Sequence, residues 1–318
     1  MTEEFFDVEV RSIRRESSSV VSLELEHPLG EDLPEWEAGA HVDVLLPNGL
    51  LRQYSLCSER SSRSAWRLGI LREPEGRGGS AYVHDLLRPG TKIQVRGPRN
   101  NFVLAPAGSY VFIAGGIGIT PILPMIREAA ALGVPWRLVY LGRSRSSMAF
   151  LEEIQALGGD VHIHADDESG LYPLAELLAD QQSDLHVYAC GPGPLLNVIQ
   201  SIADGWEEPG RFHCERFTAT GEAKAPSEVR DTAFTVELVD GTEVPVGSDE
   251  TILQALEAVG INPLNSCREG ICGTCETAVL GGEIDHRDSL LSDHEREAGD
   301  TMMICVSRCK GNRLLLDL

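Results

Sequence analysis

Four of the eight cysteines in the chain form one spaced pattern near its C-terminus. Cys267, Cys272 and Cys275 are separated by four and by two residues, and Cys305 follows after another 29. This spacing is typical of the thiolate ligands of a plant-type [2Fe–2S] cluster, in which four sulfurs converge on two irons. The sequence therefore predicts that Cys267, Cys272, Cys275 and Cys305 ligate such a cluster.

The loop that carries three of these cysteines reads CREGICGTC. Its glycines, Gly270 and Gly273, leave room for backbone N–H groups to approach the sulfurs and to offset the negative charge of a cluster. A zinc site or four unrelated thiols are the alternatives, although zinc sites usually pair two C-x2-C units and this sequence has one. Cys309 lies beyond an apolar strand and is left out of the ligand set, and Cys57 and Cys214 are expected to be buried core thiols.

Two segments in the first hundred residues have the residue types that a bound flavin needs. They are Arg52, Tyr54 and Ser55 on an expected strand, and Arg77, Gly78, Gly79 and Ser80 directly before an expected helix. An aromatic ring can lie against the flat flavin ring, while a cation and the exposed N–H groups of a helix start can hold its phosphate. Each segment alone also fits a plain structural role, with Tyr54 in a barrel core and Ser80 as a helix N-cap.

The sequence also indicates which flavin would bind. From Ser80 the chain runs directly into the helix-like segment AYVHDLL, with no added loop that carries an aromatic residue to stack on an adenine. The phosphate would then end at Arg52 and the corner formed by Gly78, Gly79 and Ser80. The sequence therefore predicts FMN rather than FAD.

Two glycine turns follow apolar strands in the middle of the chain. They contain Gly115, Gly116 and Gly118 in AGGIGITP, and Cys190, Gly191 and Pro192 in CGPG. Glycine permits a tight turn and close approach of a pyrophosphate, although AGGIGITP is not the usual G-x-G-x-x-G. Turns at neighbouring strand ends would form a crevice for a dinucleotide, and ordinary strand-to-helix turns are the alternative. Arg143 and Arg145 could meet the 2′-phosphate of NADPH or be solvated surface charges, which leaves NADH and NADPH both open.

The patterning around these segments divides the chain into three expected domains. Residues 1–104 contain alternating segments such as FFDVEVRSI, SVVSLELE and TKIQVRG, which predict an antiparallel β-barrel. Over residues 105–226, apolar strands alternate with helical segments, which predicts a parallel α/β sheet that binds ligands at the carboxyl ends of its strands. A linker is expected over 218–231. Residues 227–318, with the cysteine pattern, form the third domain.

Charge limits the partners of this chain. It has 49 Asp and Glu against 27 Lys and Arg, a net charge of −22, which argues against nucleic acid. Residues 227–318 alone hold 18 acidic and 7 basic residues, a net charge of −11. Acidic surface near the cluster would steer a basic patch on an electron acceptor, and the alternative is that these charges only confer solubility. The acidic residues around the cluster loop are Glu269, Asp285, Asp288, Asp293 and Glu295.

The N-terminus is acidic and lacks the basic and apolar regions of a secretory signal. The longest uncharged stretch is interrupted by prolines and glycines, so it reads as loop and turn rather than as a membrane span. We therefore expect a cytoplasmic protein without a membrane segment.

In this order, the motifs resemble those of the phthalate dioxygenase reductase family, which includes the vanillate demethylase reductases. The resemblance rests on R-x-Y-S-L, GGIGITP, CGP, an H-x-E-x-F ending at Phe217, and CREGICGTC with DHRD, and it spans essentially the whole chain. It implies a flavin domain of the ferredoxin reductase type, a NAD-binding domain and a C-terminal β-grasp ferredoxin domain. It also implies FMN, [2Fe–2S] and NADH as cofactors, a Rieske-type terminal oxygenase as partner, and a monomer.

The resemblance also implies roles for individual residues. FMN would be held by Arg52, Tyr54, Ser55, Gly78, Gly79 and Ser80. Thr120 would lie near the flavin and the nicotinamide, and Phe217 would lie over the isoalloxazine ring. The chain departs from the family pattern at Cys214, where members often have an aromatic residue, so the packing behind the flavin would differ.

The chemistry of the inferred cofactors sets their order. NADH delivers two electrons as a hydride, an iron–sulfur cluster accepts one, and a flavin can hold two and release them singly. We therefore expect an NADH-dependent oxidoreductase that passes single electrons through the cluster to an oxygenase, with no catalytic acid or base. The alternatives are a reductase for a haem or other oxygenase, and an electron-transfer binding protein with a vestigial flavin site.

Overall fold

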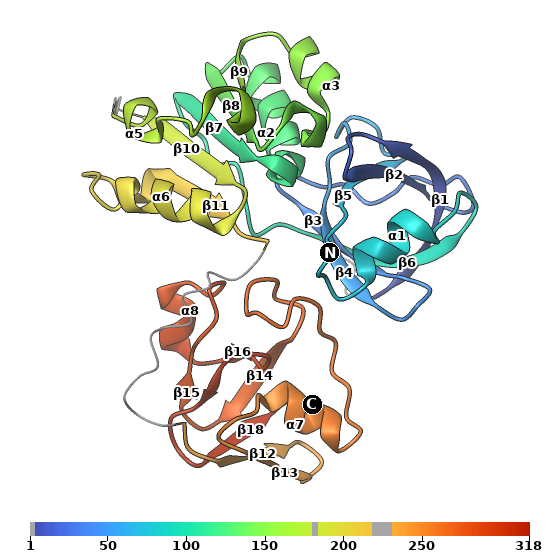
Figure 1. The fold of residues 1–318 in the computed structure, drawn as a ribbon. Helices are drawn as coiled ribbons and strands as arrows, with labels where there is room; N and C mark the ends of the chain where they lie inside the picture. Colours follow the sequence, from blue (N-terminus) through green and yellow to red (C-terminus); the bar gives the residue numbers. More distant parts are fainter. Residues whose placement is uncertain (1–3, 180–183, 218–230) are drawn as a thin grey trace. The chain divides into compact units, whose positions relative to one another are not determined.

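The computed structural model describes residues 4–179, 184–217 and 231–318. The chain divides into two compact units, Met1–Arg216 and Phe217–Leu318. The expected flavin and nucleotide domains, with their boundary at 104/105, lie together in the first unit (Figure 1). All but the last residue of the expected linker, 218–231, is outside the described residues.

The first sheet of the first unit is built from six antiparallel strands. They are β1 (Phe6–Arg15), β2 (Val20–Glu26), β3 (His41–Leu45), β4 (Leu51–Ser55), β5 (Trp66–Leu71) and β6 (Lys92–Arg99). Their order is β4-β3-β6-β1-β2-β5, and an antiparallel bridge between Leu56 and Leu68 joins the two outer strands. Alternate residues such as Val42 and Val44 of β3 face a common core. The predicted antiparallel barrel is confirmed, and one helix, α1 (Gly79–Asp85), precedes β6.

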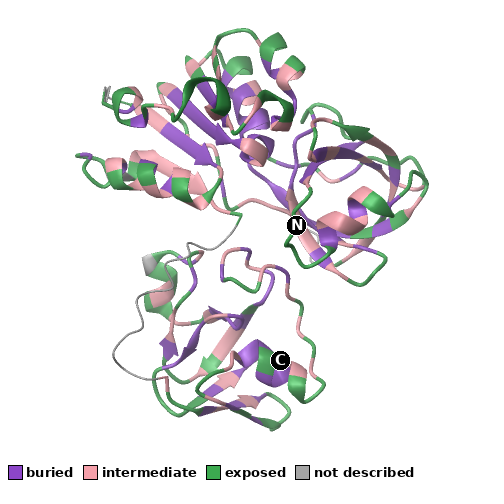
Figure 2. Ribbon diagram, viewed as in Figure 1, coloured by how far each residue is buried: buried purple, intermediate pink, exposed green. Residues whose placement is uncertain are grey.

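The second sheet of the first unit is parallel and carries helices on both faces. Its elements are β7 (Ser109–Gly115), α2 (Ile119–Ala131), β8 (Trp136–Gly142), α3 (Leu151–Ala156), β9 (Asp160–Ala165), α4 (Asp166–Ser169), α5 (Leu174–Leu177), β10 (Leu185–Cys190), α6 (Gly193–Ala203) and β11 (Phe212–Glu215), with single 3-10 turns at Gly116–Gly118, Arg145–Ser147 and Pro209–Arg211. The strand order is β11-β10-β7-β8-β9. On β7, Tyr110 and Phe112 pack in the core that contains α2, whereas Val111 and Ile113 pack in the core that contains α6. Apolar residues on both faces of β7 thus produce the predicted two-sided α/β layer, whose strands are largely buried in Figure 2.

The helix α2 begins at Ile119, directly after the first glycine turn. Pro121 is compatible with this start because residues in the first helical turn need no N–H partner. Among the described residues, no helix is long and apolar enough to cross a membrane.

The second unit contains a mixed sheet with a separate two-stranded ribbon. Its elements are β12 (Phe234–Leu238), β13 (Glu243–Val246), α7 (Ile252–Ala258), β14 (Glu276–Gly281), β15 (Ile284–Asp285), α8 (Asp293–Ala298), β16 (Thr301–Met303), β17 (Arg308–Cys309) and β18 (Arg313–Leu316). The sheet order is β13-β12-β18-β14-β16, and β15 pairs with β17. Leu253 and Leu256 of α7 pack with Val236 and Leu314 of the sheet, so the sheet and helix share one core. The loop with the cysteine pattern connects α7 to β14.

Candidate functional site

The four predicted cluster ligands come from two segments of the second unit. Cys267, Cys272 and Cys275 lie in the loop before β14, and Cys305 lies in the turn after β16. The thiols of Cys272 and Cys305 lie within hydrogen-bonding reach of Cys267, and Cys305 also lies within reach of Cys275. Cys267 is half-buried and the other three are buried. The four sulfurs are therefore neighbours in a row. Among the described residues, no group of three His, Cys, Asp or Glu side chains is placed to hold a single metal ion.

The surroundings of Cys267 favour a thiolate. Interactions with Cys272 and Cys305 are the first causes that lower the pKa of its thiol well below the ordinary value, and the backbone N–H groups of Ile271 and Glu269 add to them. The N–H of Glu269 donates to Sγ of Cys267 at 3.3 Å. Donors around convergent thiols are what an anionic iron–sulfur cluster requires, so the residues present fit that cofactor.

Gly270 explains why the cluster loop can pack tightly against its neighbours. Its φ is +70°, and a Cβ there would lie 2.5 Å from Cγ2 of Val306 and 3.0 Å from Cα of Asp288. Its carbonyl oxygen accepts the N–H of Ser289 at 3.0 Å. Glycine is therefore required at this position both by conformation and by space.

The expected surface role of Asp288 is wrong. Its side chain is 0% exposed, and its Oδ2 accepts the backbone N–H groups of Leu290 at 3.1 Å and Leu291 at 2.8 Å. Arg296 donates to the backbone carbonyl of Asp288 at 2.7 Å. Because its carboxylate accepts both of these amides, Asp288 organises the segment that packs on the cluster loop rather than an acidic docking surface.

The other acidic candidates of this domain have different environments. Glu269 and Glu295 are exposed, and Glu295 completes the capping box at the start of α8. Asp285 is partly buried and accepts a hydrogen bond from Arg287 at 2.7 Å. The side chain of Asp293 is not among those that the structure describes. Glu269 thus remains the exposed acidic residue within the cysteine loop.

In the barrel, Arg52 of β4 lies against the expected phosphate corner. Its Nη2 donates to the carbonyl of Arg77 at 2.8 Å, and its Nη1 donates to that of Leu51 at 2.7 Å. A Cβ on Gly79 would lie 2.5 Å from Nε of Arg52, so glycine lets the guanidinium approach. Gly78 precedes α1 with a φ of +82°. The structure therefore brings together the two segments that the sequence links to a flavin phosphate.

The side chains of the remaining barrel candidates, Ser80, Tyr54 and Ser55, already make contacts within the protein. Oγ of Ser80 accepts the N–H of Glu73 at 3.0 Å, which leaves its own O–H free to donate. Tyr54 is half-buried and packs on the barrel core, and burial raises its pKa to about 12. Ser55 is buried on the opposite face, where it pairs with His41. A cation, a partly exposed ring and a hydroxyl donor fit an anionic aromatic cofactor.

The two glycine turns contact each other at the carboxyl edge of the parallel sheet. A Cβ on Gly191 would lie 3.0 Å from Cα of Gly115, and one on Gly118 would lie 2.1 Å from the carbonyl oxygen of Cys190. Glycine is thus needed for the turns after β7 and β10 to pack side by side. Gly116 has a φ of +55° and faces open space. Paired turns that leave backbone groups accessible fit a dinucleotide phosphate.

The three further candidates have different environments. Pro192 is the N-cap of α6, directly after the second glycine turn. Thr120 is buried in the first turn of α2, where its Oγ1 donates to the carbonyl of Ile117 at 2.9 Å. Phe217 is 40% exposed and belongs to the second compact unit. Its expected place over the isoalloxazine ring stays a prediction.

Glu215 is a residue of this edge that the sequence reasoning missed. It ends β11 beside Cys190, its register partner on β10. Burial raises the pKa of its carboxyl to about 8, and its Oε2 has no hydrogen-bond partner among the described residues. Glu215 is the glutamate of the H-x-E-x-F motif. Its strand has four residues, which is too short for an alternating pattern to indicate that the Glu215 side chain is buried. Cys214, one position earlier, is half-buried rather than fully buried, whereas Cys57 lies in the core as expected.

Comparisons with known proteins identify relatives of this chain. A family model described as a 2Fe-2S iron-sulfur cluster binding domain matches residues 237–310. The phenoxybenzoate dioxygenase subunit beta of Ectopseudomonas oleovorans is 42% identical over 312 residues, which are 97% of this chain and 96% of that protein. The vanillate O-demethylase oxidoreductase of Pseudomonas sp. (strain HR199 / DSM 7063) is 40% identical over 320 residues, with 98% and 99% covered.

Two solved structures also match nearly the whole chain. An intact type IV self-sufficient cytochrome P450 monooxygenase is 41% identical with a TM-score of 0.87, and the match covers 99% of this chain but 41% of that protein. This chain therefore spans about two-fifths of the P450 protein, in contrast to nearly all of the curated relatives. Phthalate dioxygenase reductase is 37% identical with a TM-score of 0.73, and 99% of this chain and 98% of that chain are covered. The chain thus belongs, as its motifs predict, to the phthalate dioxygenase reductase and vanillate demethylase reductase family of oxidoreductases, the flavin and 2Fe-2S reductase subunits of Rieske-type oxygenase systems.

Proposed function

We propose that this protein oxidises NADH and delivers the electrons, through FMN and a [2Fe–2S] cluster, to a Rieske-type terminal oxygenase. When bound, the flavin takes two electrons as a hydride from NADH and gives them up one at a time to the cluster. The observation that carries the proposal is the row of four neighbouring thiols in a chain whose full length matches oxygenase reductases.

The cluster would be held by Cys267, Cys272, Cys275 and Cys305. Their mutual contacts require little rearrangement before the sulfurs can bind iron. The amide donors at Cys267 would offset cluster charge, and the buried Asp288 would keep the adjoining segment in place. These residues position the cofactor, and its redox chemistry needs no acid or base from them.

FMN would be held by Arg52, Tyr54, Ser55 and the residues 77–80. The guanidinium of Arg52 lies next to Gly79, so a cation and the N–H groups at the start of α1 could face one phosphate. After Ser80 the chain enters α1 at once, and Tyr82 of that helix packs on the barrel core. Tyr82 is half-buried against that core, and no added loop with an aromatic residue separates Ser80 from the helix, which supports FMN over FAD.

NADH would bind along the glycine turns, with Thr120 close to the nicotinamide. The buried carboxyl of Glu215 has an unpaired oxygen that could accept an N–H of the nicotinamide amide. Arg145 supports NADH over NADPH, because its Nε donates to both oxygens of Glu168 at 3.1 Å. A guanidinium neutralised in this way attracts a 2′-phosphate less strongly.

A reductase for a haem oxygenase is the second candidate. It is favoured by the 41% identity and the TM-score of 0.87 to a self-sufficient cytochrome P450 monooxygenase. The curated oxygenase relatives are matched by this chain over nearly their whole lengths, whereas the match covers 41% of the P450 protein. Identities of 40–43% to several oxygenase reductases over 98% of this chain keep the Rieske-type oxygenase as the first candidate.

Anaerobic mixing of the purified holoprotein with NADH tests the proposal. We expect bleaching of the flavin absorbance, then of the cluster absorbance, then single-electron reduction of an added Rieske oxygenase. Mass analysis of the released flavin distinguishes FMN from FAD. Reduction of a P450 haem but not of a Rieske centre would support the second candidate, and a flavin unchanged by NADH and NADPH would contradict both.

A further inference from the structure

An ion-pair cluster joins the barrel to the α/β sheet inside the first unit. Arg67 of β5 donates from Nη1 and Nη2 to the two carboxylate oxygens of Glu153 in α3, at 2.9 and 2.8 Å. Arg127 of α2 contacts the same carboxylate. The three side chains are 18–28% exposed. One carboxylate of the α/β layer therefore bridges a guanidinium of the barrel and one of its own layer, and we call these three residues the Glu153 clamp.

The two guanidiniums of the clamp also hold the chain that follows the expected flavin strand. Nη2 of Arg67 donates to the carbonyl of Cys57 at 2.8 Å. Nη1 of Arg127 donates to the carbonyls of Cys57 at 3.2 Å and Ser58 at 3.1 Å. Cys57 comes two residues after Ser55, the last residue of β4. The clamp therefore fixes the end of β4 to α2.

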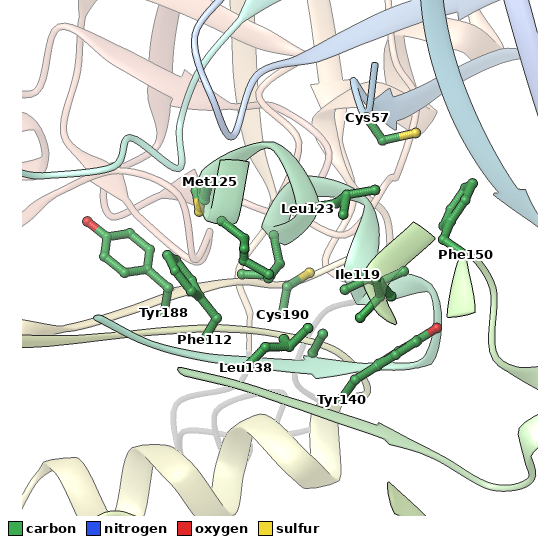
Figure 3. Packing of buried hydrophobic residues seen from close by; sticks show 14 of the residues in the cluster. Cys57, Phe112, Ile119, Leu123, Met125, Leu138, Tyr140, Phe150, Tyr188 and Cys190 are labelled. Atoms are coloured by element: carbon green, nitrogen blue, oxygen red, sulfur yellow. The ribbon is translucent and has the colours of Figure 1, made fainter. Parts of the chain in front are cut away.

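An apolar contact lies beside the clamp. A Cβ on Gly69 of β5 would lie 2.6 Å from Cγ2 of Thr120 and 3.3 Å from the ring of Phe150. The guanidinium of Arg67 lies over the same Phe150 ring, 4.9 Å from its centroid. Phe150 and Cys57 belong to the core built around α2, and Figure 3 shows both near that helix. The absence of a side chain at Gly69 thus lets Thr120 reach the barrel.

The helix α2 is attached to the barrel at two points. Thr120 in its first turn meets Gly69, and Arg127, seven residues later, belongs to the clamp. Seven residues are close to two helical turns, so both side chains project from the same side of the helix. The glycine turn expected to bind the nicotinamide end of NADH lies directly before α2.

We propose that Glu153 and Gly69 are positioning residues for hydride transfer, because they fix the nicotinamide turn relative to the flavin strand. This inference rests on the proposed function and adds residues that contact neither cofactor in it. Reacting atoms must approach to about 3–3.5 Å, and a misplacement of about 1 Å can cost about 100-fold in rate. Burial and the nearby Arg67 lower the pKa of Arg127, which indicates that the two cations face each other. Without the Glu153 carboxylate they would repel and loosen the contact.

Two substitutions disturb this contact by different physical means. Glu153→Gln removes the charge between two arginines, and Gly69→Ala inserts a methyl group against Thr120. Both should lower the limiting rate of flavin reduction by NADH about 10- to 100-fold in anaerobic stopped-flow measurements. The dissociation constant of NADH, the bound flavin and the cluster absorbance should stay near those of the parent. Glu152→Gln, an exposed change on the same helix, is the matched control and should behave as the parent.

NADH deuterated at C4 provides a readout that a loss of stability would not produce. If the variants slow the hydride step itself, the isotope effect on flavin reduction stays at least as large as in the parent. A parental limiting rate in either flavin-loaded variant overturns the inference. If Glu153→Gln loses flavin, the uncharged Gly69→Ala variant decides, and loss of flavin in both shows a role in folding and also overturns it. If NADH does not reduce the flavin of the parent protein, that result would instead contradict the proposed function.

Discussion

At the scale of single residues, Cys272 and Cys309 form a matched pair for testing the cluster ligands. Both thiols are buried, but Cys272 lies within hydrogen-bonding reach of Cys267, whereas Cys309 donates to the carbonyl of Arg313 at 3.4 Å. Cys272→Ala should abolish the iron–sulfur absorbance and leave reduction of the flavin by NADH intact. Cys309→Ala should keep both. A visible cluster in the Cys272→Ala, Cys309→Ala double variant would disprove the ligand assignment.

Arg145 and Glu168 allow a second residue-scale test, of the choice between NADH and NADPH. Both side chains are about half exposed, so their pairing is worth roughly 0.5–1 kcal/mol. Glu168→Gln frees the guanidinium and should raise kcat/KM for NADPH about two- to fivefold, with little change for NADH. Steady-state reduction of a small dye measures both. The gain in kcat/KM for NADPH should vanish in the Glu168→Gln, Arg145→Ala double variant. A gain that persists there would show that Arg145 does not contact the 2′-phosphate.

His41 predicts a dependence of stability on pH. Burial, and then the charge of Arg99, lower its pKa to about 4 from the ordinary value of 6.5. The unfolded chain therefore takes up a proton near pH 6.5 that the folded chain refuses until about pH 4, so stability falls as the pH drops between these values. By pH 5 the loss should be about 2 kcal/mol.

Urea unfolding at pH 7 and pH 5 measures this loss. His41→Gln cannot take up the proton and should lose less stability than the parent over the same interval. His162→Gln alters an exposed ring and serves as the control. An equal pH dependence in the parent and in His41→Gln would show that His41 does not contribute.

At the scale of elements, the segment from β15 to α8 supports the cluster loop through Asp288. Asp288→Ala would leave the buried N–H group of Leu291 and the partly buried one of Leu290 without their acceptor, at a cost of about 1–3 kcal/mol for the buried group. We expect a lower melting temperature and faster loss of the cluster to a chelator. Glu297→Ala on the exposed side of α8 should change neither. Unchanged cluster retention in Asp288→Ala would show that this segment does not support the loop.

Elements whose pattern is local could be predicted from the sequence, and those that depend on distant contacts could not. The barrel strands and the two-sided β7 follow from alternation within a few residues, and the spacing of the four cysteines indicates that they lie together. The burial of Asp288 depends on amides that face it only after the loop folds. Arg67 and Glu153 are 86 residues apart, so no local pattern could indicate their pairing. The same holds for Gly69, which reads as an ordinary strand residue until Thr120 packs on it.

At the scale of the whole molecule, the acidic charge suggests how an electron acceptor is attracted. The chain carries −22, and residues 227–318 carry −11 of it. Such a field can accelerate encounter with a basic partner by about 10- to 1000-fold, and salt weakens it. With Asp288 buried, Glu269 is the exposed carboxylate inside the cysteine loop and the position to test.

Glu269→Lys should slow reduction of the terminal oxygenase at low salt, because it reverses a charge within the loop that is expected to hold the cluster. Asp240→Lys makes the same change in net charge on the exposed turn between β12 and β13, and it should have a smaller effect. Reduction of a small neutral dye by NADH should be unchanged in both, since that path needs no docking. Near 1 M salt the Debye length is about 3 Å, so the rates of parent and variants should converge. If both variants slow the partner equally at low salt, net charge rather than a local docking surface steers the encounter. If neither does, Glu269 lies outside that surface.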